Sequence, residues 1–179
     1  MAEPREFISL RIAVLTVSDT RNLSDDKSGQ VLQDRIVAAG HAIADRQIVK
    51  DSVAAIRRVV RAWGKRSDID AIISTGGTGL TGRDVTVEAM RPLFEKEIEG
   101  FGTLFHMVSF QKIGTSTVQS RATAGVMRGK YIFCLPGSPG ACRDAWDEIL
   151  KFQLDYRHSP CNFVEIMPRL EEHQKRRKG

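Results

Sequence analysis

The sequence predicts an α/β domain in which helices cover both faces of a mainly parallel sheet. Short apolar runs rich in β-branched residues alternate with segments of helical periodicity, which is the pattern of strand–helix–strand units. The chain has 179 residues, 41% of them hydrophobic, and is long enough for one domain with its own core. It shows neither an internal repeat nor a linker-like segment, so we expect a single domain.

Four runs predict strands, because each is short, apolar and closed by polar or turn residues. The first reads RIAVLTVS and stops at Asp19, and the last reads YIFCL and stops at Pro136. A third, IDAIIS, stops where a glycine-rich stretch begins. The four runs cover residues 11–18, 42–49, 69–74 and 131–135.

Helical spacing of apolar residues predicts helices between these strands. The clearest helix spans 53–64, with Ser52 before it as an N-cap. Thr86 is expected to cap a helix that extends to Phe94. No element is assigned to residues 115–129, which are small and polar. The other predicted helices cover 29–39, a segment that starts near 100, and 141–156.

The two ends of the chain are expected to flank the domain. We predict an N-terminal extension over residues 1–10, the domain over 11–165 and a basic tail over 166–179. The tail carries much of the net charge of +5, and no aromatic residue interleaves its charges. A solvated end is therefore favoured over a nucleic-acid-binding arm. No apolar run approaches the ~20 residues of a membrane span and the start is not a signal peptide, so no membrane association and a cytoplasmic location are expected.

Cysteines and histidines give no motif of their own. Cys134, Cys142 and Cys161 lack CxxC spacing, which favours plain buried thiols over a disulfide framework or a zinc site. The four histidines all fall outside the motifs described next; they are His41, His106, His158 and His173.

Small residues and carboxylates gather where the predicted strands end. The first strand ends in Ser18 and Asp19, and Asp51 follows the second. The third runs into STGGTGLTGRD, residues 74–84, and the fourth into PGSP, residues 136–139. Open α/β sheets bind ligands outside the carboxyl ends of their strands, so these loops are predicted to form the site.

The glycine-rich stretch contains a literal GxGxxG from Gly77 to Gly82, but it fits neither standard nucleotide motif. A dinucleotide fingerprint usually follows the first strand and opens a helix directly, whereas this one follows the third strand and residues 83–85 intervene. A P-loop needs a lysine and a hydroxyl where Arg83 and Asp84 stand. We predict that the glycines bring backbone N–H groups close to an anion; the alternative is a purely structural turn.

A carboxylate beside a phosphate-binding loop indicates a cation, because it would otherwise repel the phosphate. Mg²⁺ takes one or two carboxylates together with phosphate oxygens. Asp84 is the first such carboxylate, and Asp51 supplies the second if the loops converge. The alternative is that each acid stabilises a helix start, Asp84 near Thr86 and Asp51 before Ser52.

Together these motifs resemble those of a known family. VLTVSD, STGGTGLTGRDVT, EGFG, QSRATAG and LPGSPGA are similar to segments of the MoaB/MogA proteins of molybdenum cofactor biosynthesis. The resemblance extends over residues 11–164, nearly the whole chain. GTSTVQSRA and SPCNF are similar to the bacterial MoaB branch in particular.

The resemblance implies a three-layer α/β/α sandwich that assembles into trimers, or into hexamers made of two trimers. Related enzymes are molybdopterin adenylyltransferases, which transfer AMP from ATP to the terminal phosphate of molybdopterin and release pyrophosphate. The resemblance also implies that Asp51 and Asp84 are the catalytic acids and that they hold Mg²⁺. The positions implied to line the nucleotide and the pterin are Ser18, Asp19, Thr75, Gly76, Gly77, Thr78, Gly79, Ser120, Arg121, Pro136, Gly137, Ser138 and Pro139.

One position departs from the pattern of the family. Many members carry a lysine or another polar side chain after the PGxP turn, where this chain has Gly140. Either a phosphate contact is missing here, or Arg143 replaces it.

Rival functions stay open at this point. A pterin-holding or scaffolding oligomer without chemistry would use the same loops, since binding a phosphate needs no metal. An NAD-linked enzyme rests only on GxGxxG, and its acidic partner would be Glu95, Glu97 or Glu99. The segment 101–110 is more apolar than one helix face usually needs, which indicates either an oligomer interface or a fully buried helix.

Overall fold

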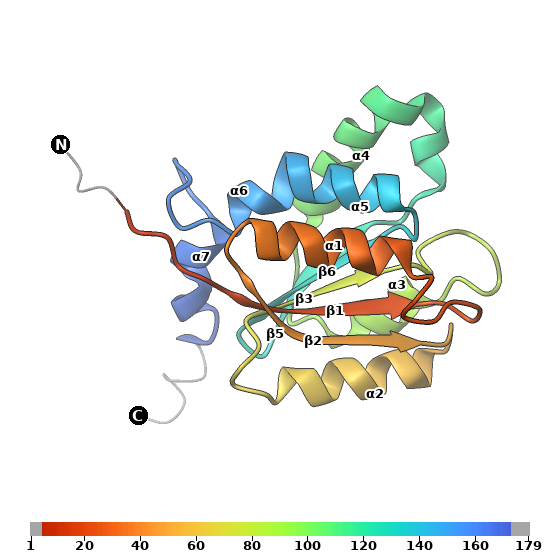
Figure 1. The fold of residues 1–179 in the computed structure, drawn as a ribbon, viewed down its shortest axis with the longest axis horizontal. Coiled ribbons are helices and arrows are strands. Elements are labelled where there is room, and N and C mark those ends of the chain that lie inside the picture. Colours follow the sequence, from red (N-terminus) through yellow and green to blue (C-terminus); the bar gives the residue numbers. More distant parts are fainter. Residues whose placement is uncertain (1–4, 173–179) are drawn as a thin grey trace.

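A computed structural model describes residues 5–172, whose centre is one six-stranded sheet with the strand order β2-β1-β3-β6-β5-β4 (Figure 1). β1 pairs in parallel with β2 and β3, and β3 pairs in parallel with β6. β5 runs antiparallel to β6, and β4 antiparallel to β5. The mainly parallel sheet is therefore confirmed. The strands are β1 (Arg11–Val17), β2 (Ala42–Val49), β3 (Ala71–Thr75), β4 (Lys96–Glu97), β5 (Thr123–Met127) and β6 (Lys130–Leu135).

The helices lie close to the predicted segments. The predicted helix over 141–156 corresponds to α5 and α6, which a π-helical turn over Trp146–Leu150 joins into one continuous helical segment. Within residues 5–172, short 3₁₀ segments cover Arg91–Leu93, Gly114–Gln119 and Met167–Arg169. The helices are α1 (Lys27–Ala38), α2 (Val53–Gly64), α3 (Thr86–Met90), α4 (Glu99–Ile113), α5 (Pro139–Ala145), α6 (Lys151–Gln153) and α7 (Phe163–Ile166).

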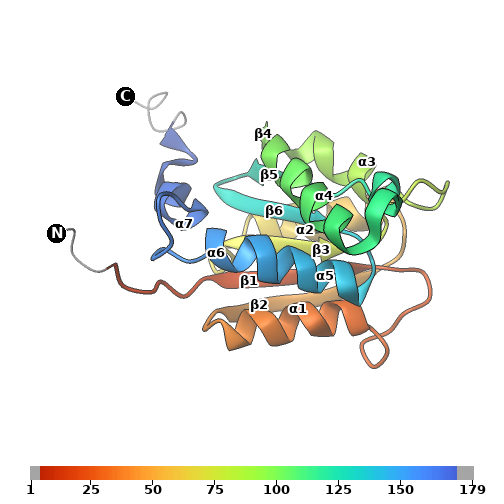
Figure 2. The same ribbon diagram turned by 90° about the horizontal axis from the view of Figure 1, so that it is seen from above.

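Helices cover both faces of the sheet, which confirms the three-layer α/β/α sandwich (Figures 1 and 2). α1, α4 and α5 pack on one face, and α2 and α3 pack on the other. β1 contributes to both layers of the core: Ile12 and Val14 face the first, while Leu15 faces the second. A central strand buried on both faces reads as a continuous apolar run, which is why RIAVLTVS is easy to recognise in the sequence.

One predicted helix cap is wrong. α3 begins at Thr86, and the residue before it, Val85, offers no side-chain cap. The hydroxyl of Thr86 instead donates to the carbonyl oxygen of Gly76 at 2.8 Å. Thr86 is therefore buried against the glycine-rich loop, where it fixes that loop to the helix.

The segment without a prediction, 115–129, holds a strand and its hairpin turn. β5 turns into β6 through Arg128 and Gly129, both at positive φ, as a two-residue hairpin turn requires. Gly125 lies in the middle of β5 because the ring of Phe94 fills the space that a side chain would need. Small residues and a packed glycine remove the β-branched signature on which the strand prediction depends.

Both flanking segments pack onto the domain as far as the structure describes them. The Phe7 ring lies against that of His41, 5.1 Å between centroids, and Leu10 is buried. Met167 and Leu170 pack on the main core cluster, so the described part of the predicted tail is not a frayed end. The remaining basic residues, 173–179, lie outside the described residues. Between residues 5 and 172 no helix is long and apolar enough to cross a membrane.

Two of the three cysteines are buried, as predicted. Burial raises the pKa of Cys142 to about 11, which keeps it a thiol at neutral pH. Cys161 is exposed, so the prediction that it is a buried thiol is wrong. Cys161 lies in the loop before α7, where the fold buries Asn162 instead.

Candidate functional site

The predicted site loops meet at one edge of the sheet. The arrowheads of β1, β2 and β3 point the same way in Figure 1, and the loops that follow them lie together at that end. β6 is parallel to β3, so the PGSP loop reaches the same edge. This is the place where an open α/β sheet binds its ligands.

Two glycines shape the loop after β3, because both adopt a positive φ, 98° at Gly76 and 67° at Gly77. A side chain on Gly76 would meet the backbone oxygen of Val17 well inside contact distance. A Cβ on Gly77 would reach the hydroxyl of Thr86 and would lie 3.1 Å from Oδ1 of Asp51. The residues that end β1, β2 and β3 therefore pack closely at this point, where the absence of side chains on the two glycines allows the contact.

Two threonines of the loop, Thr75 and Thr78, face inward. Thr75 is fully buried, and its hydroxyl donates to the carbonyl oxygen of Pro136 at 2.9 Å. Thr78 is also buried. The N–H groups of Gly77 and Thr78 donate to no acceptor in the described part of the chain. The loop therefore offers a ligand its backbone N–H groups more than its hydroxyls.

Asp51 lies beside the glycine loop in a cluster of negative charge. Its backbone N–H donates to Oδ1 of Asp19 at 3.1 Å, and the Asp19 N–H faces its carboxylate in return. Burial raises the pKa of Asp51, and the charges of Asp19 and Asp84 raise it further. The ionised carboxylate is thus held at an energetic cost, which a bound cation would remove.

Asp84 closes the glycine-rich loop on itself. Its Oδ2 accepts the N–H of Thr81 at 2.9 Å and the hydroxyl of the same residue at 2.6 Å. These bonds from Thr81 lower the pKa of Asp84 and keep it ionised. It does not cap α3, since no side chain caps that helix. A Cβ on Gly79 would lie 2.8 Å from Oδ2, so Asp84 and Asp51 flank the same few loop residues.

Arg83 balances part of this charge. Its guanidinium forms an ion pair with Asp19, which lowers the pKa of that carboxylate. Arg83 is 72% exposed, whereas Asp19 is 28% exposed, so the arginine reaches inward from the rim of the loop. No local pattern predicts this pair, because its two residues are separated by 64 positions.

The carboxylates suit a cation that the ligand helps to hold. No group of three or more His, Cys, Asp or Glu side chains that could hold a metal occurs in residues 5–172. A closed, all-protein site of the zinc or calcium type is therefore not built here. Mg²⁺ commonly uses one or two carboxylates with phosphate oxygens and water, and the pair Asp51 and Asp84 fits that donor set.

We expect Asp51→Asn to raise the melting temperature of the metal-free protein at neutral pH. A carboxyl with a raised pKa is penalised in the folded state once it ionises, so its cost appears as pH rises through the ordinary Asp range. The amide keeps an oxygen acceptor and carries no charge. Thermal unfolding followed by circular dichroism at acidic and neutral pH measures the difference.

The same experiment has an internal control in Mg²⁺. The ion should stabilise the wild type and not the variant, because a ligand that binds only the folded state raises its stability. A variant that melts below the wild type in metal-free buffer at neutral pH would contradict this view of Asp51.

Arg121 fixes the glycine loop from the other side. Its Nε donates to the carbonyl oxygen of Gly79 at 2.9 Å, and an Nη donates to that of Asp84 at 3.2 Å. The guanidinium also pairs with Glu88 on α3. Ser120 accepts the N–H of Ala122 at 3.3 Å. The side chain of Arg121 is thus committed to holding the loop in shape.

The PGSP loop is similarly constrained. Ser138 caps α5 by accepting the N–H of Ala141 at 3.1 Å, and Pro139 is the first residue of that helix. A Cβ on Gly137 would lie 3.1 Å from Cα of Gly76. The carbonyl oxygen of Gly137 accepts the hydroxyl of Ser28 at 2.9 Å and the guanidinium of Arg21 at 3.3 Å.

Ser18 and Gly140 complete the predicted set. The hydroxyl of Ser18 accepts the N–H groups of Thr20 and Arg21, which shapes the loop after β1. An Nη of Arg143 lies 4.0 Å from the place of a Cβ on Gly140. This is ordinary van der Waals contact, so the replacement of a phosphate contact by Arg143 stays a prediction.

Sequence reasoning missed three residues that the fold brings to this region. Arg21 and Arg83 lie in polar loops, where an arginine gives no signal. His106 was placed outside the motifs, yet its ring contacts the carbonyl oxygen of Ser120 at 3.0 Å. Only the packing of α4 on residues 120–122 makes that contact, and no sequence spacing records it.

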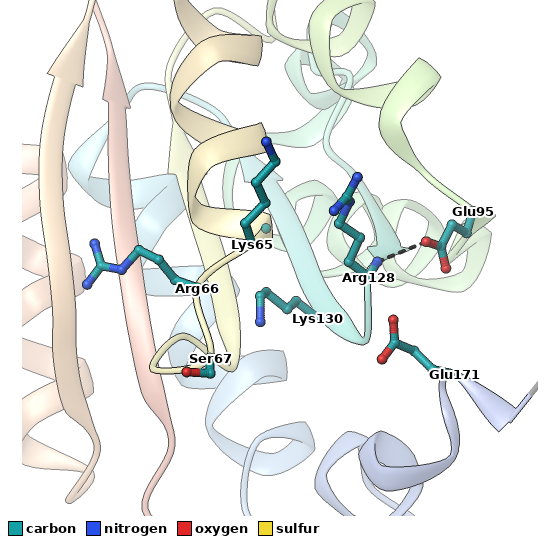
Figure 3. Close-up of a pocket in the computed structure, with 8 residues that line it drawn as sticks. Lys65, Arg66, Ser67, Glu95, Arg128, Lys130 and Glu171 are labelled. Carbon is teal, nitrogen blue, oxygen red and sulfur yellow. Dashed lines mark hydrogen bonds between the residues drawn. The ribbon is translucent and has the colours of Figure 1, made fainter. Parts of the chain in front are cut away.

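A separate cavity lies away from this edge (Figure 3). It measures about 570 Å³ and adjoins the end of α2 and the β5–β6 turn. Among its lining residues, Arg66 pairs with Asp45 and Asp68, and the N–H of Arg128 donates to Glu95. The cavity contains none of the predicted site residues, so its size does not make it the place of the chemistry.

Known proteins are similar to this chain over most of its length. A family described as a probable molybdopterin binding domain matches residues 13–156. The molybdenum cofactor biosynthesis protein B of Escherichia coli K12 is 53% identical over 158 residues, which cover 88% of this chain and 93% of that protein.

Solved structures agree as well. A crystal structure of molybdenum cofactor biosynthesis protein B has a TM-score of 0.83 at 38% identity, covering 96% of this chain and 99% of its own. The tungsten cofactor synthesizing protein MoaB from Pyrococcus furiosus has a TM-score of 0.68 at 33% identity, covering 79% of this chain and 91% of its own. The chain therefore belongs to the family of molybdopterin-binding domains that includes the molybdenum cofactor biosynthesis B proteins.

Proposed function

We propose that the protein binds molybdopterin and Mg-ATP at the sheet edge and transfers AMP to the terminal phosphate of the pterin, with release of pyrophosphate. The observation that carries this proposal is the placement of Asp51 and Asp84 on either side of one glycine loop with N–H groups left for an anion. Membership of a molybdenum cofactor biosynthesis family supports the pathway and the pterin.

The proposed reaction requires no strong general base. The nucleophile is a phosphate oxygen of the pterin, which attacks the α-phosphorus of ATP, and the bond to the pyrophosphate oxygen breaks. Such a transfer depends on alignment and on neutralising charge. Mg²⁺ would supply Lewis-acid neutralisation of the phosphate oxygens. The buried Thr75, Thr78 and Thr86 are therefore assigned to shaping the loop and not to acid–base chemistry.

The chain itself supplies the positioning. Asp51 and Asp84 would hold the cation, and the loop N–H groups would contact a phosphate. Arg121 keeps the loop closed through the carbonyl oxygens of Gly79 and Asp84. Arg83 is the one of these charged groups that can change partner, because it is largely exposed and its pairing with Asp19 lies at the rim.

Titration calorimetry with ATP tests the nucleotide part of the proposal. We expect ATP to bind in the presence of Mg²⁺ and to bind much more weakly when the ion is removed with a chelator. Asp51→Asn should lose most of the dependence on Mg²⁺. Binding of ATP that is equal with and without Mg²⁺ would contradict the metal-bridged arrangement.

The alternative is a protein that holds molybdopterin and performs no transfer. It is favoured by one observation: the carboxylate of Asp84 already accepts both donors of Thr81, so the loop is complete without a metal. Specific pterin binding without pyrophosphate release would identify this function.

We also propose that the chain forms a homo-oligomer, a trimer or a hexamer, through α4 and the segment after it. Phe101 and Phe105 of α4 are buried, but the other side of the helix exposes large apolar side chains. Val118, in the 3₁₀ segment that follows α4, is 77% exposed as well. The exposed apolar residues of α4 and of the segment after it are Leu104, Met107, Phe110, Ile113 and Val118.

A double substitution in this face should dissociate the oligomer. We expect Met107→Asp with Phe110→Asp to give a folded monomer, because charges placed in an apolar interface are left unpaired when it closes. Size-exclusion chromatography with light scattering measures the mass. Phe152→Asp, an exposed phenylalanine on α6, is the control and should leave the mass unchanged. A wild type that is already a monomer would overturn the proposal.

A further inference from the structure

A buried lysine lines the cavity between the end of α2 and the β5–β6 turn (Figure 3). Lys130, the first residue of β6, is 8% exposed, and its Nζ donates to the carbonyl oxygen of Ile69 at 2.8 Å. An ammonium group has three N–H donors, and within residues 5–172 the other two have no acceptor. Burial lowers the pKa of Lys130, because the charged form is poorly solvated there. The charge is thus held at a cost that a bound anion would reduce.

Two more cations line the same cavity without an ion-pair partner. Lys65 follows the last residue of α2, and Arg128 lies in the β5–β6 turn. Both side chains are exposed, and neither forms an ion pair with a carboxylate of the described residues. Figure 3 shows the side chains of Lys65, Arg128 and Lys130 around one space. Three positive charges from separate parts of the chain therefore meet at this end of the cavity.

Packing fixes the elements that carry these cations. A Cβ on Gly64 would lie 3.5 Å from Cδ of Arg128, so the end of α2 contacts the hydrocarbon stem of that side chain. The turn after α2 is held by Arg66, which forms ion pairs with Asp45 and Asp68. A ligand would therefore find the backbone of this site already in place.

The backbone of Arg128 is unusual for an arginine. Its φ is 50°, and that of Gly129 is 70°. Hairpin turns with two positive φ angles are commonly built by Asn-Gly, because asparagine adopts this conformation more readily than most side chains do. The turn itself thus gives no reason for an arginine, whereas recognition of an anion by a guanidinium does.

The two carboxylates that line the cavity face four cations. Glu95 accepts the N–H of Arg128 at 3.0 Å, and Oε2 of Glu171 would lie 3.2 Å from a Cβ on Gly129. In the view of Figure 3 both carboxylates lie beyond Arg128 when seen from the two lysines. An anion is therefore favoured at the lysine end. The charged groups that act on Lys130 itself are Asp70, Glu171, Arg11 and Asp68.

We propose that this cavity binds the phosphate group of a small ligand between Lys65, Arg128 and Lys130, at a second site away from the sheet edge. A phosphate dianion has several oxygens, so it can accept hydrogen bonds from ammonium and guanidinium groups at once. The volume of about 570 Å³ is in the range of small-molecule sites and leaves room for the rest of a ligand. The inference does not depend on AMP transfer, since neither Asp51 nor Asp84 lines the cavity.

Amide nuclear magnetic resonance spectra locate the binding, because the glycine loop is also proposed to contact a phosphate. Protein labelled with ²H and ¹⁵N is titrated with inorganic phosphate at neutral pH and constant ionic strength, without Mg²⁺. We expect the amides of residues 65–67 and 128–130 to shift together and to give one Kd. Shifts of residues 76–79 report the glycine loop separately.

Arg128→Asn and Lys65→Gln should each raise the Kd given by the cavity amides by roughly tenfold, the effect of one hydrogen bond between charged groups. Asparagine suits the positive φ of the turn, so the first variant is expected to fold. Lys130 is left unchanged, because its bond to the carbonyl oxygen of Ile69 also supports the fold.

Arg58→Gln is the matched control, because Arg58 is exposed on α2 and does not line the cavity. It should leave the Kd unchanged. Cavity amides that do not shift would overturn the proposal, and so would an unchanged Kd in the double variant Lys65→Gln with Arg128→Asn. Equal weakening by Arg58→Gln would also overturn it, since the attraction would then come from the overall charge of the protein.

A parallel titration with AMP separates the two sources of the phosphate group. Tighter binding of AMP than of inorganic phosphate at residues 65–67 and 128–130 supports the phosphate of a larger ligand. Binding of inorganic phosphate at least as tight as that of AMP supports the free ion. If neither shifts these amides while residues 76–79 respond, the cavity site fails and the proposed function stands. If the cavity amides alone respond, this inference stands and the phosphate contact of the glycine loop fails.

Discussion

Asp84→Asn is expected to leave the fold intact and to slow AMP transfer by about a hundredfold or more, the scale at which a single group that stabilises developing charge contributes. The amide oxygen can still accept the N–H and the hydroxyl of Thr81, so the loop keeps its shape. What is lost is one of the two charges that we propose hold the cation. Pyrophosphate release in the presence of ATP, Mg²⁺ and molybdopterin measures the rate, and circular dichroism confirms the fold.

Asp34→Asn is the matched control for this variant. Asp34 lies on the exposed face of α1 and accepts a hydrogen bond from Gln30 at 2.7 Å, away from the sheet edge. It should release pyrophosphate at the wild-type rate. Unchanged turnover in Asp84→Asn would remove that residue from the proposed metal site.

Gly76→Ala is expected to destabilise the protein by about 3 kcal/mol or more, since it combines a left-handed backbone with overpacking against rigid atoms. The φ of Gly76 is 98°, and the added methyl group would meet the backbone oxygen of Val17, which cannot move without displacing β1. Urea denaturation at neutral pH gives the free energy of unfolding of both proteins.

Gly82→Ala separates this effect from the loss of any glycine in the same loop. A Cβ on Gly82 meets no atom within 4 Å, and its φ is not positive. Its stability should stay within about 0.5 kcal/mol of the wild type, as for an ordinary surface substitution. Equal destabilisation by the two variants would show that the interlock of Gly76 with β1 is not what holds the loop.

The sequence predicted the fold where local chemistry and tertiary packing agree. β1 and β2 begin at the predicted residues, and Ser52 caps α2 by accepting the N–H of Ala55. β5 was not predicted because it contains small residues. At Gly125 a larger residue would clash with the ring of Phe94. This constraint comes from Phe94, a residue 31 positions away, and therefore leaves no trace in the local sequence pattern.

The site divides in the same way. Strand ends and glycine spacing were enough to place the loops at one edge, because the topology of a parallel sheet brings its carboxyl ends together. The same features did not predict the hydrogen bond from Arg121 to the carbonyl oxygen of Gly79, or the contact of His106 with Ser120. Those depend on how α4 and residues 120–122 pack on the loop, and packing of this kind is decided in three dimensions.

Pyrophosphate release by the wild-type protein tests the central claim most directly. The protein is incubated with ATP and Mg²⁺, with and without molybdopterin, and pyrophosphate is measured by a coupled assay. AMP transfer at the edge formed by Asp51, Asp84 and the glycine loop predicts release that requires both the pterin and Mg²⁺. Tight molybdopterin binding with no pyrophosphate released would contradict the transfer and leave a protein that holds its pterin.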